Sequence, residues 1–232
     1  MPLPLYLAMT PEEIAWSSQI PHNFAYLSCH FSSTGTGLSN FPEQIPRNGI
    51  LILDDSQQMD GHDPEQIAEE LFTIPGFQNA RGVVLDFQQP GKPESAGMAE
   101  FLTKTLPCPV AVSHHYATAL SGPVFLPPLP PDQTPDAYLS PWKHRPVWLE
   151  VALDAIQIHI TESGAVRNYL PTHNESKHGF TDQTLGCHYK IAMESNAAVF
   201  TLYRTRSDLD TLLQTLSGGC IQMAIGLWQE LG

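Results

Sequence analysis

The sequence predicts an α/β protein, a (β/α)8 TIM-type barrel of somewhat reduced size with a β-hairpin insertion after the seventh strand. Eight short apolar segments recur along the 232 residues. Most are continuous rather than alternating, which is typical of parallel strands covered on both faces. Helical patterns separate several of these segments, and repeated strand–helix alternation indicates a β/α fold. We expect a single barrel-like domain over residues 1–232.

The apolar segments give the expected barrel strands, in chain order residues 5–9, 24–31, 49–55, 82–87, 109–115, 122–128, 147–153 and 221–228. The chain is shorter than the ~250 residues typical of this fold. The shortage falls between the sixth and seventh strands, where PPLPPDQTPDAYLSPWK (127–143) contains too much proline for a full helix. We therefore expect one or two of the helical units to be reduced to turns.

Four segments have helical patterns: residues 11–18, 63–74, 94–106 and 206–219. Pro11 is well placed near the start of the first, because proline suits the opening turn of a helix. Asp63, followed by Pro64, is the expected N-cap of the second. Ser207 is the candidate N-cap of the fourth helix, which a glycine pair ends.

Residues 155–203 have a different pattern and are expected to form an antiparallel β insertion. IQIHITES alternates apolar and polar residues, and GAVRNY, CHYKIAME and AVFTLYRT follow it. A turn at Ser195-Asn196 would join the last two, which is hairpin chemistry.

Composition excludes several classes of partner. Lys and Arg number 11 against 24 Asp and Glu, giving a net charge of −13. Binding of nucleic acid or of an anionic membrane needs clustered positive charge, so neither is expected. No apolar run approaches the ~20 residues of a membrane span, and the N-terminus lacks the pattern of a signal peptide, so we expect a cytoplasmic protein.

The four cysteines contain no CxxC pair, which disfavours a zinc ribbon or a redox pair. Cys29 and Cys108 lie in or beside apolar segments and are interpreted as small buried hydrophobes. We expect no cofactor and no metal.

The candidate site lies at the carboxyl ends of the strands, where β/α barrels carry their active sites. The residues there are acidic, polar or aromatic. Carboxylates for acid and base work and rings for stacking on sugars suit a carbohydrate site. The candidates are His30, Asp54, Asp55, Asp86, Gln88, His114, Tyr116, Glu150, Trp228 and Glu230.

Each candidate also has a structural interpretation. Asp54-Asp55 could equally cap a loop, and Trp228 could equally belong to the core. His114 and His115 fit packing or solvation better than ligand binding. No ligand-spaced partners accompany these residues, so a metal site has weak support. Glu150 is more informative, because a carboxylate within an apolar strand is costly unless it is partnered or functional.

Two stretches resemble the chitinase-like glycoside hydrolases of family 18, in particular the spore-germination and cortex-lytic branch. GVVLDFQ (82–88) is similar to the family's fourth strand, which reads roughly D-G-[ILV]-x-[IL]-D-[FY]-E. Residues 187–232 are similar to its C-terminal strand pair, Ser-led helix, glycine stop and Trp-bearing strand. The resemblance implies that Asp86 is the family's orienting Asp and that Trp228 is the Trp at the floor of its sugar subsite.

The chain differs from this family at the positions of the family's catalytic motifs. Gln88 stands where the family has its general acid, and an amide cannot give up a proton near neutral pH. Val83 breaks the D-x-x-D spacing, and ILILDD replaces S-x-G-G on the third strand.

The resemblance therefore implies a barrel that binds a small molecule or oligosaccharide, with lost or weak hydrolase activity. Two alternatives stay open. One is an active glycosidase in which Glu150, Asp54 or Asp55 supplies the acid. The other is an unrelated metal-dependent barrel enzyme using His30, His114 and His115 with Asp54.

Overall fold

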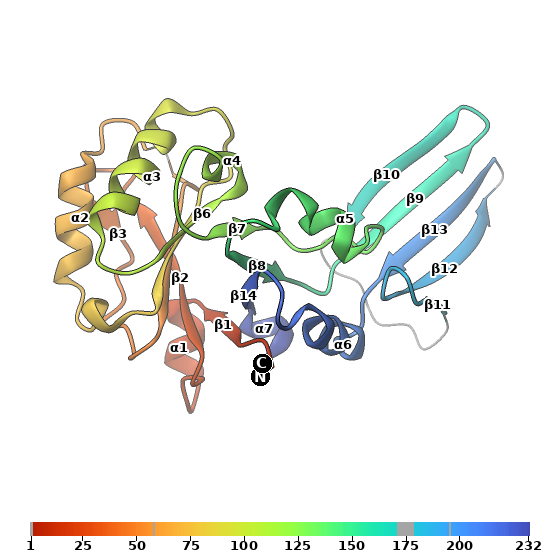
Figure 1. Cartoon of the computed structure of the whole chain (residues 1–232), viewed down its shortest axis with the longest axis horizontal. Helices are drawn as coiled ribbons and strands as arrows, with labels where there is room; N and C mark the ends of the chain where they lie inside the picture. Colours follow the sequence, from red (N-terminus) through yellow and green to blue (C-terminus); the bar gives the residue numbers. More distant parts are fainter. Residues whose placement is uncertain (1, 58, 171–178, 195) are drawn as a thin grey trace.

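The structure, a computed structural model, describes residues 2–57, 59–170, 179–194 and 196–232 as a barrel with a projecting sheet (Figure 1). All eight predicted strands form. They pair in parallel around the ring, and β1 pairs with both β14 and β2, which closes the barrel. The strands are β1 (Leu5–Met9), β2 (Phe24–Phe31), β4 (Ile50–Asp54), β5 (Gly82–Asp86), β6 (Val110–Ser113), β7 (Val124–Leu126), β8 (Val147–Val151) and β14 (Ile221–Leu227).

The connecting helices are uneven in length, as the proline content predicts. The longer ones are α1 (Pro11–Trp16), α2 (Pro64–Thr73), α3 (Pro93–Thr105) and α6 (Arg206–Leu216). Short helical pieces occupy the connections after β6 and β7: α4 (His114–Ala117), α5 (Pro135–Leu139) and η2 (Ser140–Trp142). A short piece η1 (Phe77–Asn79) follows α2, and α7 (Trp228–Leu231) follows β14. The connection from β2 to β4 carries β3 (Leu38–Ser39), which pairs antiparallel with β2 outside the ring.

Helix caps confirm one prediction and correct another. The Asp63 side chain accepts a hydrogen bond from the Glu65 amide at 3.0 Å, as expected of an N-cap. Ser207 is not the cap of α6; Thr205 is. The Thr205 hydroxyl accepts from the Asp208 amide at 3.2 Å, and the Asp208 carboxylate accepts from the Thr205 amide at 2.8 Å. Ser207 already lies within the first turn of α6, which begins at Arg206, so the reciprocal capping box forms between Thr205 and Asp208.

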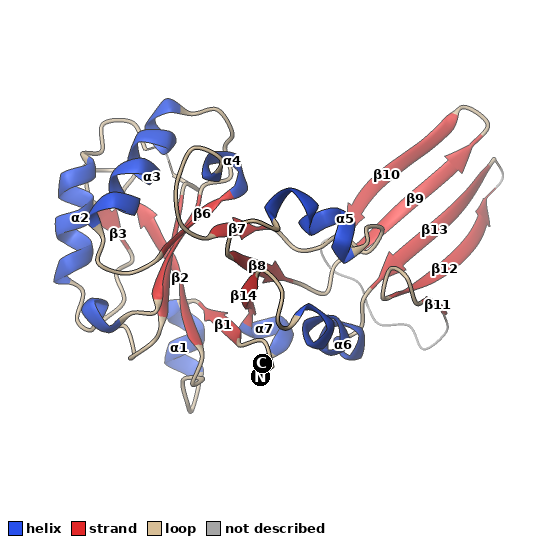
Figure 2. Cartoon of the chain, in the orientation of Figure 1, coloured by secondary structure: helices blue, strands red, loops and turns tan. Residues whose placement is uncertain are grey.

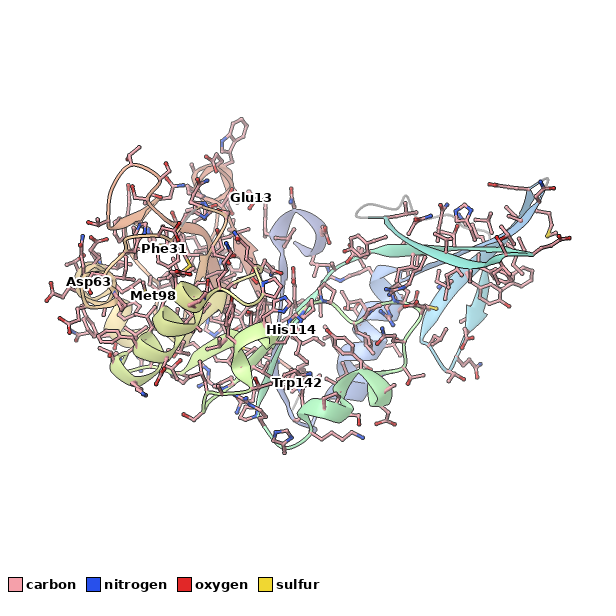
Figure 3. All side chains as sticks on the ribbon, turned by 90° about the horizontal axis from the view of Figure 1, so that it is seen from above. Glu13, Phe31, Asp63, Met98, His114 and Trp142 are labelled. Carbon is pink, nitrogen blue, oxygen red and sulfur yellow. The ribbon has the colours of Figure 1, made fainter. Side chains whose placement is uncertain are left out.

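The side chains that fill the ring form an interior cluster with members from all eight barrel strands. These members are Tyr6, Ala8, Ala25, Ile50, Ile52, Val84, Ala111, Phe125, Trp148, Met223 and Ile225. Between the ring and helices α2 and α3 lies an outer cluster that includes Phe31 and Met98, both labelled in Figure 3. The barrel is therefore a packed core with no open channel at this level.

The insertion forms a five-stranded antiparallel sheet, which confirms the prediction for residues 155–203 (Figure 2). Its strand order is β10-β9-β13-β12-β11. The strands are β9 (Ala155–Thr161), β10 (Gly164–Leu170), β11 (Phe180–Asp182), β12 (Cys187–Glu194) and β13 (Ala197–Tyr203). Ser195 of the predicted turn lies outside the described residues.

A buried arginine ties this sheet to the barrel loops. Arg204 is only 5% exposed and donates to main-chain carbonyls on both sides of the junction. Nη1 bonds to the Leu129 carbonyl, and Nη2 bonds to those of Pro130 and Leu185 at 3.3 and 3.2 Å. Nε reaches the Gly186 carbonyl at 3.3 Å. One planar guanidinium thus holds two segments that follow different strands.

Replacing Arg204 with Met should lower the free energy of unfolding by about 3 kcal/mol, because buried carbonyls lose their donors. Chemical denaturation followed by circular dichroism would measure the change. Arg47→Met, at an exposed position, is the control and should change stability by less than about 0.5 kcal/mol. Equal stability of both variants would contradict the role assigned to Arg204.

Candidate functional site

Three carboxylates continue the inward-facing rows of the barrel to its carboxyl end. Side chains alternate along a strand, so the residue two positions after an inward one also faces inward. Ile52 and Val84 belong to the interior cluster, and Asp54 and Asp86 follow them by two positions. Trp148 is the corresponding interior residue before Glu150. The mouth of the barrel is therefore lined by acids from β4, β5 and β8.

His30, Asp54 and Asp86 lie side by side across three neighbouring strands. The ladder pairs His30 with Asp54 and Asp54 with Asp86. The His30 Nδ1 atom lies 2.6 Å from the Asp54 Oδ2 atom. The Ser56 amide donates to the other oxygen, Oδ1, at 2.9 Å. Asp54 is thus held by two donors at the rim of the mouth.

Asp86 is hydrogen-bonded to Gln88, the residue at the position of the family's general acid in the sequence comparison. The Gln88 side-chain amide donates from Nε2 to Asp86 Oδ1. The pKa of Asp86 is raised to about 6, mainly by burial; the Gln88 hydrogen bond opposes the rise, and the Asp54 and Asp55 carboxylates contribute to it. Asp86 is therefore mainly ionised at neutral pH, and Gln88 stabilises that anion.

Asp55 belongs to the loop beside the mouth. It is 4% exposed, and its oxygens accept from the main-chain amides of Gln88 at 2.8 Å and Gln89 at 3.2 Å. It also lines a small cavity between the loops after β4 and β5, together with Met59 and Lys92. These contacts fit the interpretation of Asp55 as a loop-capping residue, since its carboxylate fixes the backbone that carries Gln88.

Glu150 is the acid whose surroundings oppose its charge most strongly. Burial, and after it the nearby carboxylates of Asp86, Asp154 and Glu230, together raise the pKa of Glu150 to about 8. Glu150 is therefore mainly protonated at neutral pH. Asp86 and Glu150, both at the mouth, are in opposite protonation states there, which is the arrangement that separates a base from an acid.

Tyr169 is a residue of this site that the sequence analysis missed. It lies on β10 of the inserted sheet, and its hydroxyl is hydrogen-bonded to Asp154. Burial raises its pKa, as do Asp154, Glu150 and Glu230. Reading strand ends could not find it, because it reaches the mouth from outside the barrel. Tyr169 follows Val151, the last residue of β8, by 18 residues and lies on a strand without alternating burial, so no local pattern links it to the mouth.

His114 and Tyr116 follow β6 on the short helix α4, so the strand itself ends at Ser113. The rings of His114 (labelled in Figure 3) and His115 lie tilted by 37° with centroids 3.9 Å apart, and burial and His115 lower the pKa of His114. The Tyr116 hydroxyl donates to the Gln89 carbonyl and accepts from the Lys92 amide at 3.1 Å. Tyr116 therefore supports the loop after β5.

Trp228 and Glu230 lie on α7, just past the end of β14, which closes at Leu227. They are thus at the same end of the barrel as Asp86. Trp228 is partly buried against the outer cluster, whereas Leu227 packs against the interior cluster. Glu230 accepts from the Leu153 amide at 3.2 Å. Glu230 joins the acids around Glu150, and the indole of Trp228 packs mainly on the outer side.

The described residues provide no group of three or more His, Cys, Asp and Glu side chains arranged to hold a metal ion. His30 and Asp54 pair with each other, and His114 pairs with His115. Within the same described ranges, no helix is long and apolar enough to cross a membrane.

No protein-family model matches the chain, and no curated protein sequence matches it. Several solved structures match the fold of the chain. The spore cortex-lytic enzyme SleL of Bacillus megaterium QM B1551 gives a TM-score of 0.56 at 8% identity, covering 97% of this chain and 70% of that one. A chitinase from Chromobacterium violaceum gives 0.55 at 7% identity, covering 97% and 93%. At such identities the likeness shows a shared fold, a TIM-type barrel.

Proposed function

We propose that the barrel mouth binds a carbohydrate and that hydrolysis is absent or slow because Gln88 replaces the proton donor. The observation that carries this proposal is the bond from the Gln88 amide to Asp86. The amide sits beside the carboxylate as a catalytic acid would, yet it has no proton to give to a leaving oxygen. The family-18 resemblance of GVVLDFQ supports the same interpretation of both residues.

The surface next to the mouth suits sugar rings. Tyr169, which bonds to Asp154, lies in one cross-strand row of the inserted sheet with apolar and aromatic neighbours, and Tyr169 and Phe180 are more than half exposed. Residues paired across strands share a face, but Ile156 and Leu202 at the centre of the row are only 1% and 8% exposed, so the rings open to a sugar are those toward its two ends. Carboxylates for hydroxyl groups beside rings for stacking are the usual elements of a carbohydrate site. The row is Tyr169, Ile156, Leu202, Tyr189 and Phe180.

Oligomers of N-acetylglucosamine should bind the protein with a dissociation constant of about 1 mM or tighter, measured by isothermal titration calorimetry. Asp86→Ala should weaken binding about tenfold or more, because a buried charged acceptor is lost. Asp136→Ala, which alters an exposed acid paired with Lys143, should bind as the native protein does. No heat of binding at several millimolar ligand would defeat the proposal.

Gln88→Glu should increase hydrolysis of these oligomers by about 100-fold or more, because a positioned general acid contributes that much. Product formation by chromatography measures the change. Gln78→Glu adds the same charge at an exposed position and should leave the rate unaltered. If the Gln88 variant binds the oligomer but is no faster than the native protein, the missing proton donor does not limit the reaction.

A second candidate function is slow hydrolysis with Glu150 as the acid. The elevated pKa of about 8 favours it, because Glu150 carries a proton at neutral pH without being the family's usual donor. In this case Glu150→Gln removes the remaining turnover, and native activity declines as pH rises through 8.

The Glu150 carboxyl group should also affect the free energy of unfolding of the protein. Its pKa is raised on folding, so its stabilising contribution is present below about pH 4.5 and is lost as pH rises through 8. Glu150→Gln stays neutral, and relative to the native protein it should gain on the order of 2–4 kcal/mol between pH 5 and pH 9, at about 1.4 kcal/mol per pKa unit. Urea denaturation at both pH values tests this. Parallel pH dependence of the two proteins would show that Glu150 is not perturbed.

A further inference from the structure

Strand β2 contains a β-bulge just before it reaches the mouth. Tyr26 pairs with Leu51 and Cys29 pairs with Leu53, so two residues of β2 lie opposite one residue of β4. One of the two, Ser28, has φ of +97°. This conformation is uncommon for a residue with a side chain and costs on the order of 1–3 kcal/mol. The fold therefore gives up stability at this position.

The bulge decides which side chain faces the barrel mouth. Ala25 belongs to the interior cluster and Leu27 packs against it, so regular alternation would next turn Cys29 inward and His30 outward. The extra residue reverses this order. Cys29 is instead buried in the outer cluster, and His30 takes its place beside Asp54 in the inward row. Bulges beside active sites are known to redirect side chains in this way.

The hydrogen bond to Asp54 fixes the tautomer of the His30 ring, that is, which nitrogen carries the proton. An ionised carboxylate can only accept, so the 2.6 Å contact places the proton of His30 on Nδ1. The Ser56 hydroxyl lies 3.3 Å from the same nitrogen, and the Ser56 amide anchors Asp54. In the neutral ring Nε2 is then a proton acceptor. The His30 side chain is 24% exposed, so the ring is open to solvent.

We propose that His30 and Asp54 form a proton-accepting dyad of the barrel mouth, with Nε2 of His30 as the base that activates water. The inference rests on the proposed carbohydrate site and deepens it. It places the general base on β2 and β4, whereas Gln88 on β5 stands at the position of the general acid. Asp54 acts as a positioning residue, since it holds the tautomer and stabilises the imidazolium that forms.

The reaction assigned to the dyad is hydrolysis of a glycosidic bond with water as co-reactant. As the water oxygen forms a bond to the anomeric carbon, one of its protons passes to Nε2 of His30. The bond from that carbon to the leaving oxygen breaks, and the leaving oxygen keeps the electron pair. An aryloxide leaves without a proton, whereas an alkoxide takes one from a protonated acid. Solvent then removes the proton from His30 and restores the neutral ring.

A 2,4-dinitrophenyl N-acetyl-β-glucosaminide tests the base step by itself, because this leaving group needs no acid and Gln88 is then no obstacle. His30→Gln should lower kcat by about 100-fold or more with KM changed little. His22→Gln, at an exposed site outside the mouth, is the matched control and should match the native rate. Added imidazole should restore turnover to His30→Ala, which a purely structural role would not allow.

Nitrogen-15 NMR of the free protein gives a readout that does not depend on substrate. We expect the Nδ1-protonated tautomer of His30 in the native protein and a mixture in Asp54→Asn. A native ring protonated on Nε2 overturns the proposal, and so does unchanged kcat in His30→Gln.

Absence of turnover in the native protein also overturns the dyad. If oligosaccharide still binds in the calorimeter, the carbohydrate-binding proposal stands alone. If it does not bind, both proposals fail.

Discussion

The double pairing of β1, with β14 on one side and β2 on the other, is the constraint on which the site depends. Closing the parallel ring turns alternate side chains of every strand into a shared interior, and that interior is filled with apolar groups. The next inward-facing side chains along the strands lie beyond this filled interior, and they converge at the mouth of the barrel. Residues far apart in sequence, from Asp54 to Glu150, are brought together by closure alone.

Closure also sets the electrostatics of the mouth. The charges that act on Glu150 come from Asp86, Asp154 and Glu230, all of them carboxylates. Burial above an apolar floor disfavours ionisation, and like charges disfavour it further, so one group responds by keeping its proton. Asp86 avoids this outcome in part because the Gln88 amide stabilises its anion. The amide at position 88 thus favours the charged form of its neighbour.

The strands and their order could be predicted from the sequence, because apolar segments of strand length are a local signal. The acids at strand ends were predictable for the same reason. The separation of Asp54 from Asp55 was predictable in principle, since neighbouring residues face opposite sides of a strand. One lies in the inward row, and the other anchors the loop that carries Gln88. Their shared residue type hid this difference.

Other features depend on geometry that no local pattern carries. The bulge at Ser28 has no glycine to announce it, and strict alternation along β2 would turn His30 outward; His30 was predicted for the site only from its place near the end of the strand. The cap of α6 is Thr205, two residues before the predicted Ser207, because Asp208 completes a reciprocal pair with Thr205. Tyr169 reaches the mouth through tertiary contact with Asp154. The bulge and the position of Tyr169 depend on contacts between separate strands and loops, whereas the cap depends on a pair of residues three positions apart.

Two separate sets of hydrogen bonds attach the inserted sheet to the barrel and position it beside the site. Near the mouth, Tyr169 bonds to Asp154, three residues after β8. Farther along, Arg204 anchors the sheet to carbonyls of the loop after β7 and of the segment before β12. A sheet held at one point could pivot, whereas contacts to two loops restrict its orientation. The hydroxyl of Tyr169 therefore approaches the acids from a fixed direction, and the mouth has a wall that the barrel strands alone do not supply.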